Sequence, residues 1–423
     1  YLDDEGELQI KAEKYGQKLE MGKLSTALIY AIGQKDFRPI SLPIAEDAPN
    51  IAIGDLKKLR NPTMQLLENP FILKHQDKTW EILPEEKLSF LKAEKVKGKT
   101  QLAIREEQLN QFMKTLAGEI NILPRGKVVK ESDDGKVLEF ALLGNGIELD
   151  EEKFTTEFEK AFLGGKTELE VETKEIGKSA DINKYGIKEL IGYGESNYAG
   201  SSPSRASNLI LAGEKASGVL VPPNGVYSFN KAVGPINAET GFGAAWIIAG
   251  GRTVLGTGGG ACQTSTTLFR AVLNAGLPIV KRHAHAYRVG YYEKDQPVGF
   301  DAAVAQPTWD MKFRNDTENY VLVQAYAKPE ETKLIFKIYG TSDGRKVEIS
   351  KPVITGETPP PAPLYQETAS LKKGQIQQVD FSAWGATSVF SRKVTKDGKV
   401  LFEETYKSVY RPWQAVFLVG TAN

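Results

Sequence analysis

The sequence predicts a multidomain α+β protein, with repeated α+β units at the N-terminus, a central mixed α/β domain and a small all-β module at the C-terminus. Its 423 residues exceed what one hydrophobic core usually supports, so about two to four domains are expected. A helical pattern recurs within the first half of the chain. Beyond Gly192 the composition shifts to Gly, Ser and Ala, and the last part alternates apolar and polar residues as strands do.

The first half contains a repeat. Two segments match at an offset of 45 residues, LAIREEQLNQFMKTL at 102–116 and IELDEEKFTTEFEKA at 147–161. Each pattern is that of an amphipathic helix with an acidic pair in its first turn. The match predicts that Leu109 and Met113 are buried at positions equivalent to Phe154 and Phe158. A weaker third copy, KLEMGKLSTALIYAI, lies at 18–32.

Short strands are expected around these helices, such as PISLPI at 39–44 and TELEVET at 167–173. The turn signal Asp134-Gly135 predicts a strand pair, which we place among the repeats. We therefore expect a first, partial unit over residues 1–62 and further units over 63–180. These units have no Cys and a single His, so stacking is favoured over catalysis.

Charge and hydropathy exclude two classes of partner. Lys plus Arg and Asp plus Glu number 54 each, so no net field favours nucleic acid or an anionic membrane surface. No apolar run approaches the roughly 20 residues that span a bilayer. The chain opens with YLDDEGELQI and no Met, which is compatible with a trimmed signal or anchor upstream. A single Cys fits an extracytoplasmic bacterial protein and fits a cytosolic one nearly as well.

The second half divides into three parts. Residues 188–350 combine a Gly-rich and Ser-rich stretch with later alternating strands. The proline-rich segment PVITGETPPPAPLY at 352–365 predicts a linker of polyproline type. Residues 366–423 read as short strands broken at turns. We expect this last module to make few contacts with the rest and to be dispensable for any chemistry.

Chemistry-bearing residues gather in the central domain. Cys262, the only cysteine, follows GTGGGA and opens a polar helix start, where unpaired amides and the helix dipole favour a thiolate. His283 and His285 follow in RHAHAYRVGYY, which reads as an extended strand with both rings on one face. The cysteine therefore has either a reactive or a packing role, and the polar start of the helix favours reactivity.

This region resembles a known family. The runs PNGVYSFN, GGGACQTSTTLFRA and RHAHAYRV look like the VanW domain, which we place at 188–350. The N-terminal repeats resemble a peptidoglycan-binding domain that often precedes VanW, and residues 366–423 look like the G-five module of Gram-positive wall proteins. The resemblance implies an exported or membrane-anchored protein, facing the cell wall, that binds and remodels peptidoglycan. It implies no particular reaction.

Three chemistries compete for the central domain. In the first, Cys262 is a nucleophile, His285 or His283 its base and Asp301 the orienting group. The order of these residues, with gaps of 23 and 16 between Cys262, His285 and Asp301, is similar to that of transglutaminase-like and NlpC-type cysteine peptidases. In the second, Glu195 in the small-residue loop GYGESNYAG is the acid of a lytic transglycosylase or muramidase. Its partner carboxylate in hydrolysis would be Glu239 or Asp301.

The third chemistry is a metal site, in which His283 and His285 bind with Asp301 or Cys262, but the pattern is unspecific and we expect neither metal nor cofactor. A non-catalytic peptidoglycan-binding scaffold is the remaining alternative. In an enzyme, polar side chains near the two motifs would bind the glycan strand or stem peptide. These candidates are Ser196, Arg205, Gln263, Thr264, Ser265, Thr266, Arg282 and Tyr287.

Overall fold

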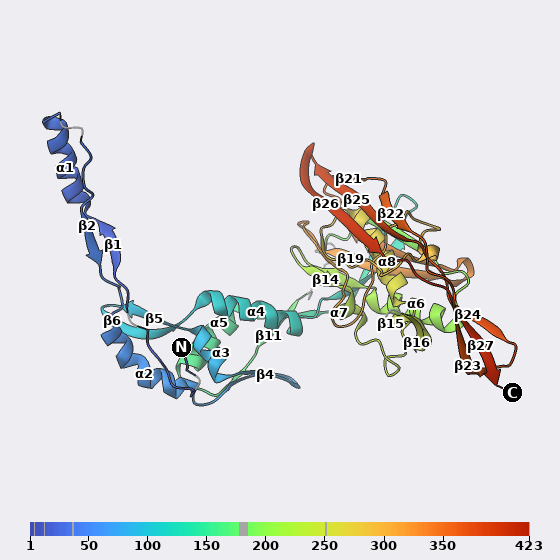
Figure 1. Ribbon diagram of the computed structural model, residues 1–423, viewed down its shortest axis with the longest axis horizontal. Coiled ribbons are helices and arrows are strands. Elements are labelled where there is room, and N and C mark those ends of the chain that lie inside the picture. Colours follow the sequence, from blue (N-terminus) through green and yellow to red (C-terminus); the bar gives the residue numbers. More distant parts are fainter. Residues whose placement is uncertain (4, 12, 36–37, 177–184, 250–251, 423) are drawn as a thin grey trace. The chain divides into compact units, whose positions relative to one another are not determined.

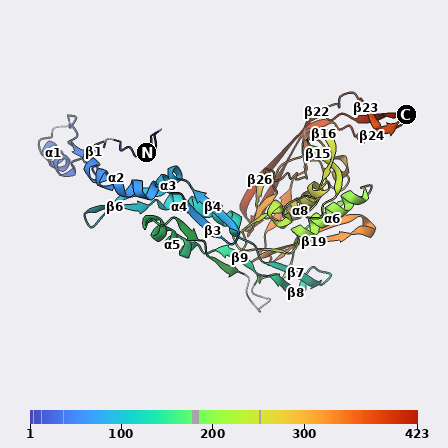
Figure 2. The same ribbon diagram turned by 90° about the horizontal axis from the view of Figure 1, so that it is seen from below.

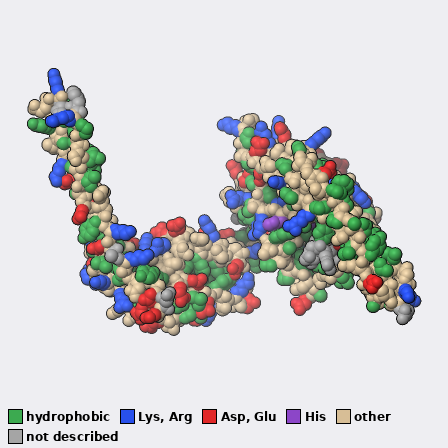
Figure 3. All heavy atoms as spheres, in the orientation of Figure 1, with side chains coloured by type: hydrophobic (Ala, Val, Ile, Leu, Met, Phe, Trp, Pro, Cys, Tyr) green, Lys and Arg blue, Asp and Glu red, His purple; other side chains and the backbone are tan. Residues whose placement is uncertain are grey.

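The computed structural model describes the chain except residues 4, 12, 36–37, 177–184, 250–251 and 423, which are drawn in grey (Figures 1, 2 and 3). Its contacts divide the chain into two compact units. The first unit consists of Tyr1–Ile122 and Ile147–Glu175, and the second of Leu123–Gly146 and Ile176–Asn423. Helices and strands mix in both, as predicted. Within the described residues, no helix is long and apolar enough to cross a membrane.

The first unit contains small sheets and five helices among its described residues. Its sheets pair β1 with β2, β5 with β6 and β9 with β11, and order β10-β3-β4. Its helices are α1 (Met21–Gly33), α2 (Ile53–Leu67), α3 (Pro84–Phe90), α4 (Glu106–Ile120) and α5 (Glu151–Leu163). Its strands are β1 (Gly16–Leu19), β2 (Ile44–Asp47), β3 (Phe71–His75), β4 (Lys78–Ile82), β5 (Leu91–Val96), β6 (Lys99–Ile104), β9 (Gly146–Leu149), β10 (Glu168–Glu170) and β11 (Thr173–Ile176).

The repeat is confirmed for two of its three copies. Helices α4 and α5 each follow a short strand, and Leu109, Met113, Phe154 and Phe158 are all buried in one shared core. The spacing of four residues puts each pair on one helix face. That face is where the two copies contribute to the common core.

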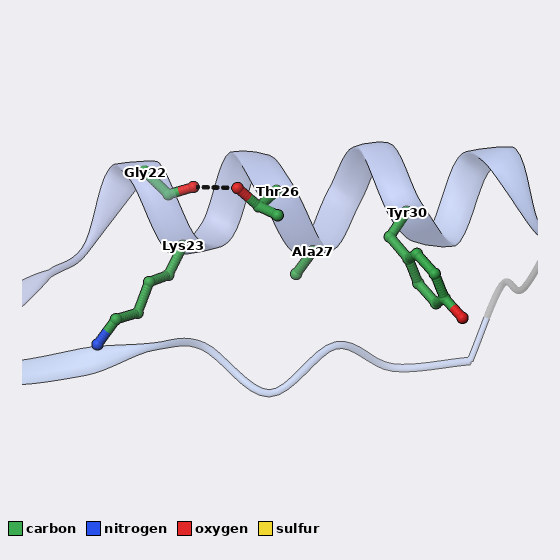
Figure 4. A pocket seen from close by; sticks show the side chains of 5 residues that line it. All are labelled: Gly22, Lys23, Thr26, Ala27 and Tyr30. Atoms are coloured by element: carbon green, nitrogen blue, oxygen red, sulfur yellow. Dashed lines mark hydrogen bonds between the residues drawn. The ribbon is translucent and has the colours of Figure 1, made fainter.

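The third copy differs. Helix α1 has no buried residue, and Leu28 is exposed. The strand expected at 39–44 begins only at Ile44. Figure 4 shows Lys23, Ala27 and Tyr30 directed from α1 toward the extended segment beside it, around an open hollow whose lining includes no Cys, His, Asp or Glu. This hollow is not a candidate active site.

The second unit is built on a six-stranded sheet with the order β12-β20-β19-β13-β7-β8. Helix α8 packs on β12 and β20, and α6 packs on β19. The helices are α6 (Pro203–Ala216), α7 (Phe229–Val233) and α8 (Ala261–Ala275). The strands up to β20 are β7 (Arg125–Glu131), β8 (Val137–Gly144), β12 (Glu189–Asn197), β13 (Val219–Val221), β14 (Val226–Ser228), β15 (Ala244–Ala249), β16 (Arg252–Thr257), β17 (Ile279–Lys281), β18 (Lys312–Arg314), β19 (Val321–Lys328) and β20 (Lys333–Gly340).

The hairpin β7–β8 corrects the predicted domain boundary. The turn at Asp134-Gly135 forms as expected, but the hairpin extends the sheet of the second unit and does not join the repeats. Val128 and Phe140 are buried against Leu220 and other apolar residues of that sheet. The apolar face of this hairpin therefore finds its core in the second unit.

The C-terminal module comprises β21–β27 and is all-β, as predicted. One sheet orders β21-β25-β22 with β26 beside β25, and a second orders β23-β27-β24. The strands are β21 (Lys346–Ile349), β22 (Val353–Thr358), β23 (Leu364–Lys372), β24 (Ile376–Asp380), β25 (Gly385–Lys396), β26 (Lys399–Tyr410) and β27 (Val416–Ala422). The predicted linker at 352–365 is wrong in its first half, because β22 is hydrogen-bonded to β25.

The expected isolation of this module is also wrong. Phe390 stacks on Phe300 with ring centroids 4.2 Å apart. The fully buried Arg392 donates hydrogen bonds to the carbonyls of Val272, Leu273 and Leu277, at and just beyond the end of α8. A face of β25 and β26 therefore belongs to the core of the central domain.

Candidate active site

Cys262 is the second residue of helix α8. The preceding Gly260 has φ of 120°, and a Cβ there would lie 2.8 Å from the carbonyl oxygen of Arg205. Glycine is thus required by both backbone conformation and space. No described residue accepts a hydrogen bond from the Cys262 amide, and the thiol is half-buried. The predicted position at a helix N-terminus is confirmed, with the favourable end of the helix dipole beside the sulfur.

His285 and Asp301 lie together behind the thiol. Asp301 Oδ2 accepts hydrogen bonds from His285 Nδ1 at 2.5 Å and from the His285 backbone amide at 2.8 Å. Cys262 Sγ donates a hydrogen bond to the carbonyl of Val304 at 3.4 Å and accepts one from the Val304 amide at 3.5 Å. The His285 side chain also interacts with the thiol, and each of the two groups shifts the pKa of the other. Because Asp301 occupies Nδ1, we assign the contact with the thiol to Nε2. The structure thus brings together the three residues that the sequence proposed as a triad, although their catalytic role stays a prediction.

These contacts determine the charges of the pair. Burial disfavours the imidazolium, but the interactions with Asp301 and Cys262 outweigh it and raise the pKa of His285 to about 9. Burial also raises the pKa of the Cys262 thiol, but the interaction with His285 outweighs it and leaves that pKa below its usual value. Burial likewise raises the pKa of Asp301, but His285 and Arg282 hold it far below its usual range. The shifts of His285 and Cys262 both favour the thiolate–imidazolium form of the pair over the neutral form.

A pH profile of cysteine alkylation tests this pair. We expect iodoacetamide to modify Cys262 at neutral pH faster than an ordinary thiol, because the thiolate persists below the usual titration range. His285→Ala should slow the alkylation at pH 7 by roughly tenfold, which corresponds to a rise of one unit in the pKa of the thiol. Mass spectrometry reads this unambiguously, since the chain has one Cys. His283→Ala is the matched control, and equal effects of both histidine variants would contradict the assignment.

His283 lies elsewhere. Its ring stacks on Trp309 with centroids 5.2 Å apart, and its backbone carbonyl accepts a hydrogen bond from the Ala303 amide at 2.8 Å. The expected strand through both histidines is wrong: His283 forms an isolated bridge, and Gly290–Tyr292 is a one-turn 3-10 helix. Among the described residues, no group of three His, Cys, Asp or Glu side chains is arranged to hold a metal ion. The metal alternative therefore has no geometric support.

Glu195 lies on strand β12 and not in the predicted loop. Glycines flank this part of the strand because α8 packs closely on it: a Cβ at Gly194 would lie 2.4 Å from the Ala271 amide nitrogen. Tyr193 donates a hydrogen bond to the Glu195 carboxylate at 2.5 Å, and Lys333 lies 3.7 Å from it. Both partners belong to a carboxylate at the surface of the sheet edge.

The two carboxylates proposed as partners of Glu195 are also unsuited. Asp301 is buried and bound to His285, and Glu239 is exposed in a turn. The loop prediction failed because a Gly-rich run can mark close packing as well as a turn.

The hydroxyl residues after Cys262 are structural, contrary to the prediction that they bind substrate. Thr264, Ser265 and Thr266 are fully buried. Ser265 and Thr266 donate hydrogen bonds to the carbonyl of Ala302 at 2.6 and 3.3 Å, and Thr264 donates to Leu209. These contacts fix the start of α8 inside the domain and leave no surface for a ligand.

Ser196, Gln263 and Arg282 are likewise interior residues. The amide nitrogen of Gln263 donates to Ser196 at 3.1 Å, and both residues are buried. Arg282 donates to Asp301 Oδ1 at 3.0 Å and to its backbone carbonyl at 2.6 Å, so it orients the carboxylate instead of binding substrate. Tyr287 is half-buried and stacks on Trp413 at 4.2 Å.

Arg205 is the remaining predicted binding residue with a free charge. Its guanidinium donates to Gln263 Oε1 at 2.9 Å and to the Tyr291 hydroxyl at 3.0 Å, and it stacks over the Tyr291 ring. It forms no ion pair with any described carboxylate. Tyr291 is 41% exposed. Through Gln263, this cation is linked to the residue that follows Cys262 in α8.

The matches with known proteins now define the class. Residues 204–339 match a family model described as VanW like protein, and the chain belongs to the VanW-domain family. Its relatives include the uncharacterized protein YoaR of Bacillus subtilis, 31% identical over 222 residues, which are 52% of this chain and 70% of YoaR. The vancomycin B-type resistance protein VanW of Enterococcus faecalis is 28% identical over 137 residues, or 32% of this chain and 49% of that protein.

Two solved structures are similar over parts of the chain. One is titled Structure of the Ldtfm-avibactam carbamoyl enzyme; it has 16% identity, a TM-score of 0.22, and covers 30% of this chain and 48% of its own. The other is an IgA1 protease G5 domain, with 15% identity, a TM-score of 0.13, and coverage of 19% and 94%. Cys262, His285 and Asp301 lie inside the VanW match, whereas Glu195 lies outside it.

Proposed function

We propose that the protein is a thiol enzyme that transfers or hydrolyses acyl groups of peptidoglycan stem peptides on the outer side of the membrane. The observation that carries this is the Cys262–His285–Asp301 arrangement at the N-terminus of α8. Membership of the VanW family supports work on the cell wall, as does the enterococcal relative whose name refers to vancomycin resistance. The N-terminal repeats would bind the wall, as their resemblance to peptidoglycan-binding domains implies.

The chemistry follows from the charges of the pair. The Cys262 thiolate attacks a peptide carbonyl carbon, and the oxyanion that forms is stabilised by the free amide of Cys262. The C–N bond then breaks, and the His285 imidazolium gives its proton to the leaving amine. A second nucleophile attacks the thioester, gives its proton to His285 and releases Cys262. Water makes the enzyme a peptidase, and an amine of a second stem peptide makes it a transpeptidase.

Incubation with purified sacculi, followed by mass spectrometry of the muropeptides, tests this proposal. New or broken peptide links are the expected result. Anhydro-muramyl ends would instead assign the activity to a glycan-cleaving site such as Glu195. An unchanged digest with protein that sediments with the sacculi would overturn the enzymatic function in favour of a binding scaffold.

Arg205 should determine affinity for the substrate peptide. Its guanidinium contacts Gln263, the residue after Cys262, and the exposed Tyr291. It suits a substrate carboxylate, because arginine binds carboxylates through two parallel hydrogen bonds. We expect Arg205→Ala to lower kcat/KM by roughly 10- to 100-fold, mainly through KM, the effect of losing a charged hydrogen bond. Steady-state kinetics on a stem peptide measures this. If Arg205→Ala lowers kcat/KM by the same factor on a substrate whose carboxylate is amidated, the role in carboxylate binding is wrong.

A further inference from the structure

We propose that the C-terminal module completes the active site, and that Tyr410 at the end of β26 is a positioning residue for Asp301. The inference rests on the proposed function for its effect on turnover, but not for its effect on the thiol. It replaces the expectation that this module is dispensable. Tyr410 lies outside the segment that matches the VanW family.

The first step is the hydrogen bonding of the Asp301 carboxylate. One oxygen, Oδ2, accepts from the amide and Nδ1 of His285. The other oxygen, Oδ1, accepts from Arg282 Nη2 at 3.0 Å and from the Tyr410 hydroxyl at 2.5 Å. Four donors therefore fix the plane of a carboxylate that is 5% exposed. The C-terminal module supplies one of the two donors to Oδ1.

The second step is the placement of Tyr410. Strand β26 pairs along β25, and side chains two residues apart on a strand point to the same face. Accordingly Ser408, two residues before Tyr410, accepts a hydrogen bond from Arg282 Nη2 at 2.9 Å. The next backbone amide, that of Arg411, donates to the carbonyl of Ala286 at 2.8 Å. The end of β26 thus holds Arg282, Asp301 and the residue that follows His285.

The third step is the limited room for a substitute donor. A small cavity lined by Asp301, Tyr292 and Tyr410 has a volume of only about 10 Å³, at the lower limit of what one water molecule needs. Burial and the charge of Asp301 raise the pKa of Tyr410. The phenol therefore keeps its proton at neutral pH and remains a hydrogen-bond donor. The ionisable groups around the carboxylate are Cys262, Arg270, Arg282, His285, Tyr292, Glu293 and Tyr410. Among these, Tyr410 alone belongs to the C-terminal module.

Tyr410→Phe tests the proposal in the full-length protein. It removes the hydroxyl and keeps the ring, so packing should persist. Without the hydrogen bond from Tyr410, the Asp301 carboxylate should orient and stabilise the His285 imidazolium less well. The pKa of the Cys262 thiol should therefore rise. We expect alkylation of Cys262 by iodoacetamide at pH 7 to slow by about tenfold, with the pH profile displaced upward by about one unit. On stem peptides kcat should fall by a similar factor with little change in KM.

Tyr365→Phe is the matched control, because Tyr365 is an exposed tyrosine of the same module. It should leave the alkylation profile unchanged. If Tyr410→Phe folds and its profile matches wild type, the positioning role is wrong. If Tyr410→Phe does not fold, the alkylation profile of Ser408→Ala tests the contribution of β26 instead. A slowing of Cys262 alkylation by about threefold, the effect of losing one hydrogen bond, supports the positioning role. An unchanged profile overturns it.

The two proposals fail in distinguishable ways. A wild-type thiol that is alkylated as a depressed thiolate but turns over no muropeptide would overturn the proposed reaction. The displaced profile of Tyr410→Phe would still support the positioning role in that case. A change in the melting temperature without a change in the pH profile would show that Tyr410 is merely structural.

Discussion

Cys262→Ala should abolish wall modification, with a loss on the order of 10⁴-fold or more, as for removal of the nucleophile from other covalent catalysts. The sulfur interacts with His285, and the chain has no second Cys that could replace it. Release of muropeptide products from sacculi, quantified by mass spectrometry, measures the effect. Cys262→Ser should be nearly as inactive, because a serine hydroxyl would not be ionised by the same contacts.

The fold of the Cys262→Ala protein is expected to persist. The thiol is half-buried, so its loss removes little packing, and the melting temperature should change by a few degrees at most. Glu195→Gln provides the opposing test, since Glu195 is the alternative catalytic residue on β12. Full activity in Cys262→Ala together with a loss in Glu195→Gln would reverse the proposed assignment.

The triad could be predicted because its signals are local. A cysteine between a glycine run and a polar helix start indicates a helix N-terminus, and His285 and Asp301 follow within 39 residues of Cys262. The sequence left both His285 and His283 open as the base. The residues after His285 form no strand, and the contact with Asp301 distinguishes the two histidines.

Burial at the start of α8 was the main thing that the sequence did not reveal. A Thr-rich first turn is typical of a ligand site, but here Thr264, Ser265 and Thr266 face the interior and satisfy backbone carbonyls. Hydroxyls can be buried when such partners are present. Similarly, the glycines around Glu195 suggested a loop, and their cause is the close approach of α8, which only the tertiary structure shows.

The contribution of the C-terminal module had no sequence signal at all. Tyr410 follows Asp301 by 109 residues and lies in a strand that reads as part of an independent β module. The prolines between β22 and β23 suggested separation, but β22 itself pairs with β25. Contacts between residues so far apart in the sequence depend on how the surfaces of the two parts fit together. The periodicity of apolar residues does not indicate such contacts.

Arg392→Ala should be the most destabilising single change in the C-terminal module, because it removes a fully buried guanidinium between two parts of one core. The side chain donates to three carbonyls of α8 and the segment after it, and pairs with Glu404. Breaking such a buried pair costs about 3–5 kcal/mol, since the remaining groups lose their partner without regaining water. We expect a loss of this size in the free energy of unfolding measured in urea.

Arg411→Ala is the matched control, because the Arg411 side chain is exposed and should change stability by less than about 0.5 kcal/mol. The shape of the urea unfolding transition shows whether α8 and the C-terminal module are coupled. If α8 and the C-terminal module unfold together, fluorescence and circular dichroism should report one shifted midpoint for the second unit in Arg392→Ala. Two separate transitions, with Cys262 alkylation unchanged after the first, would mean that the module docks without supporting the helix that carries the thiol. That outcome would remove the structural basis for its contribution to the site.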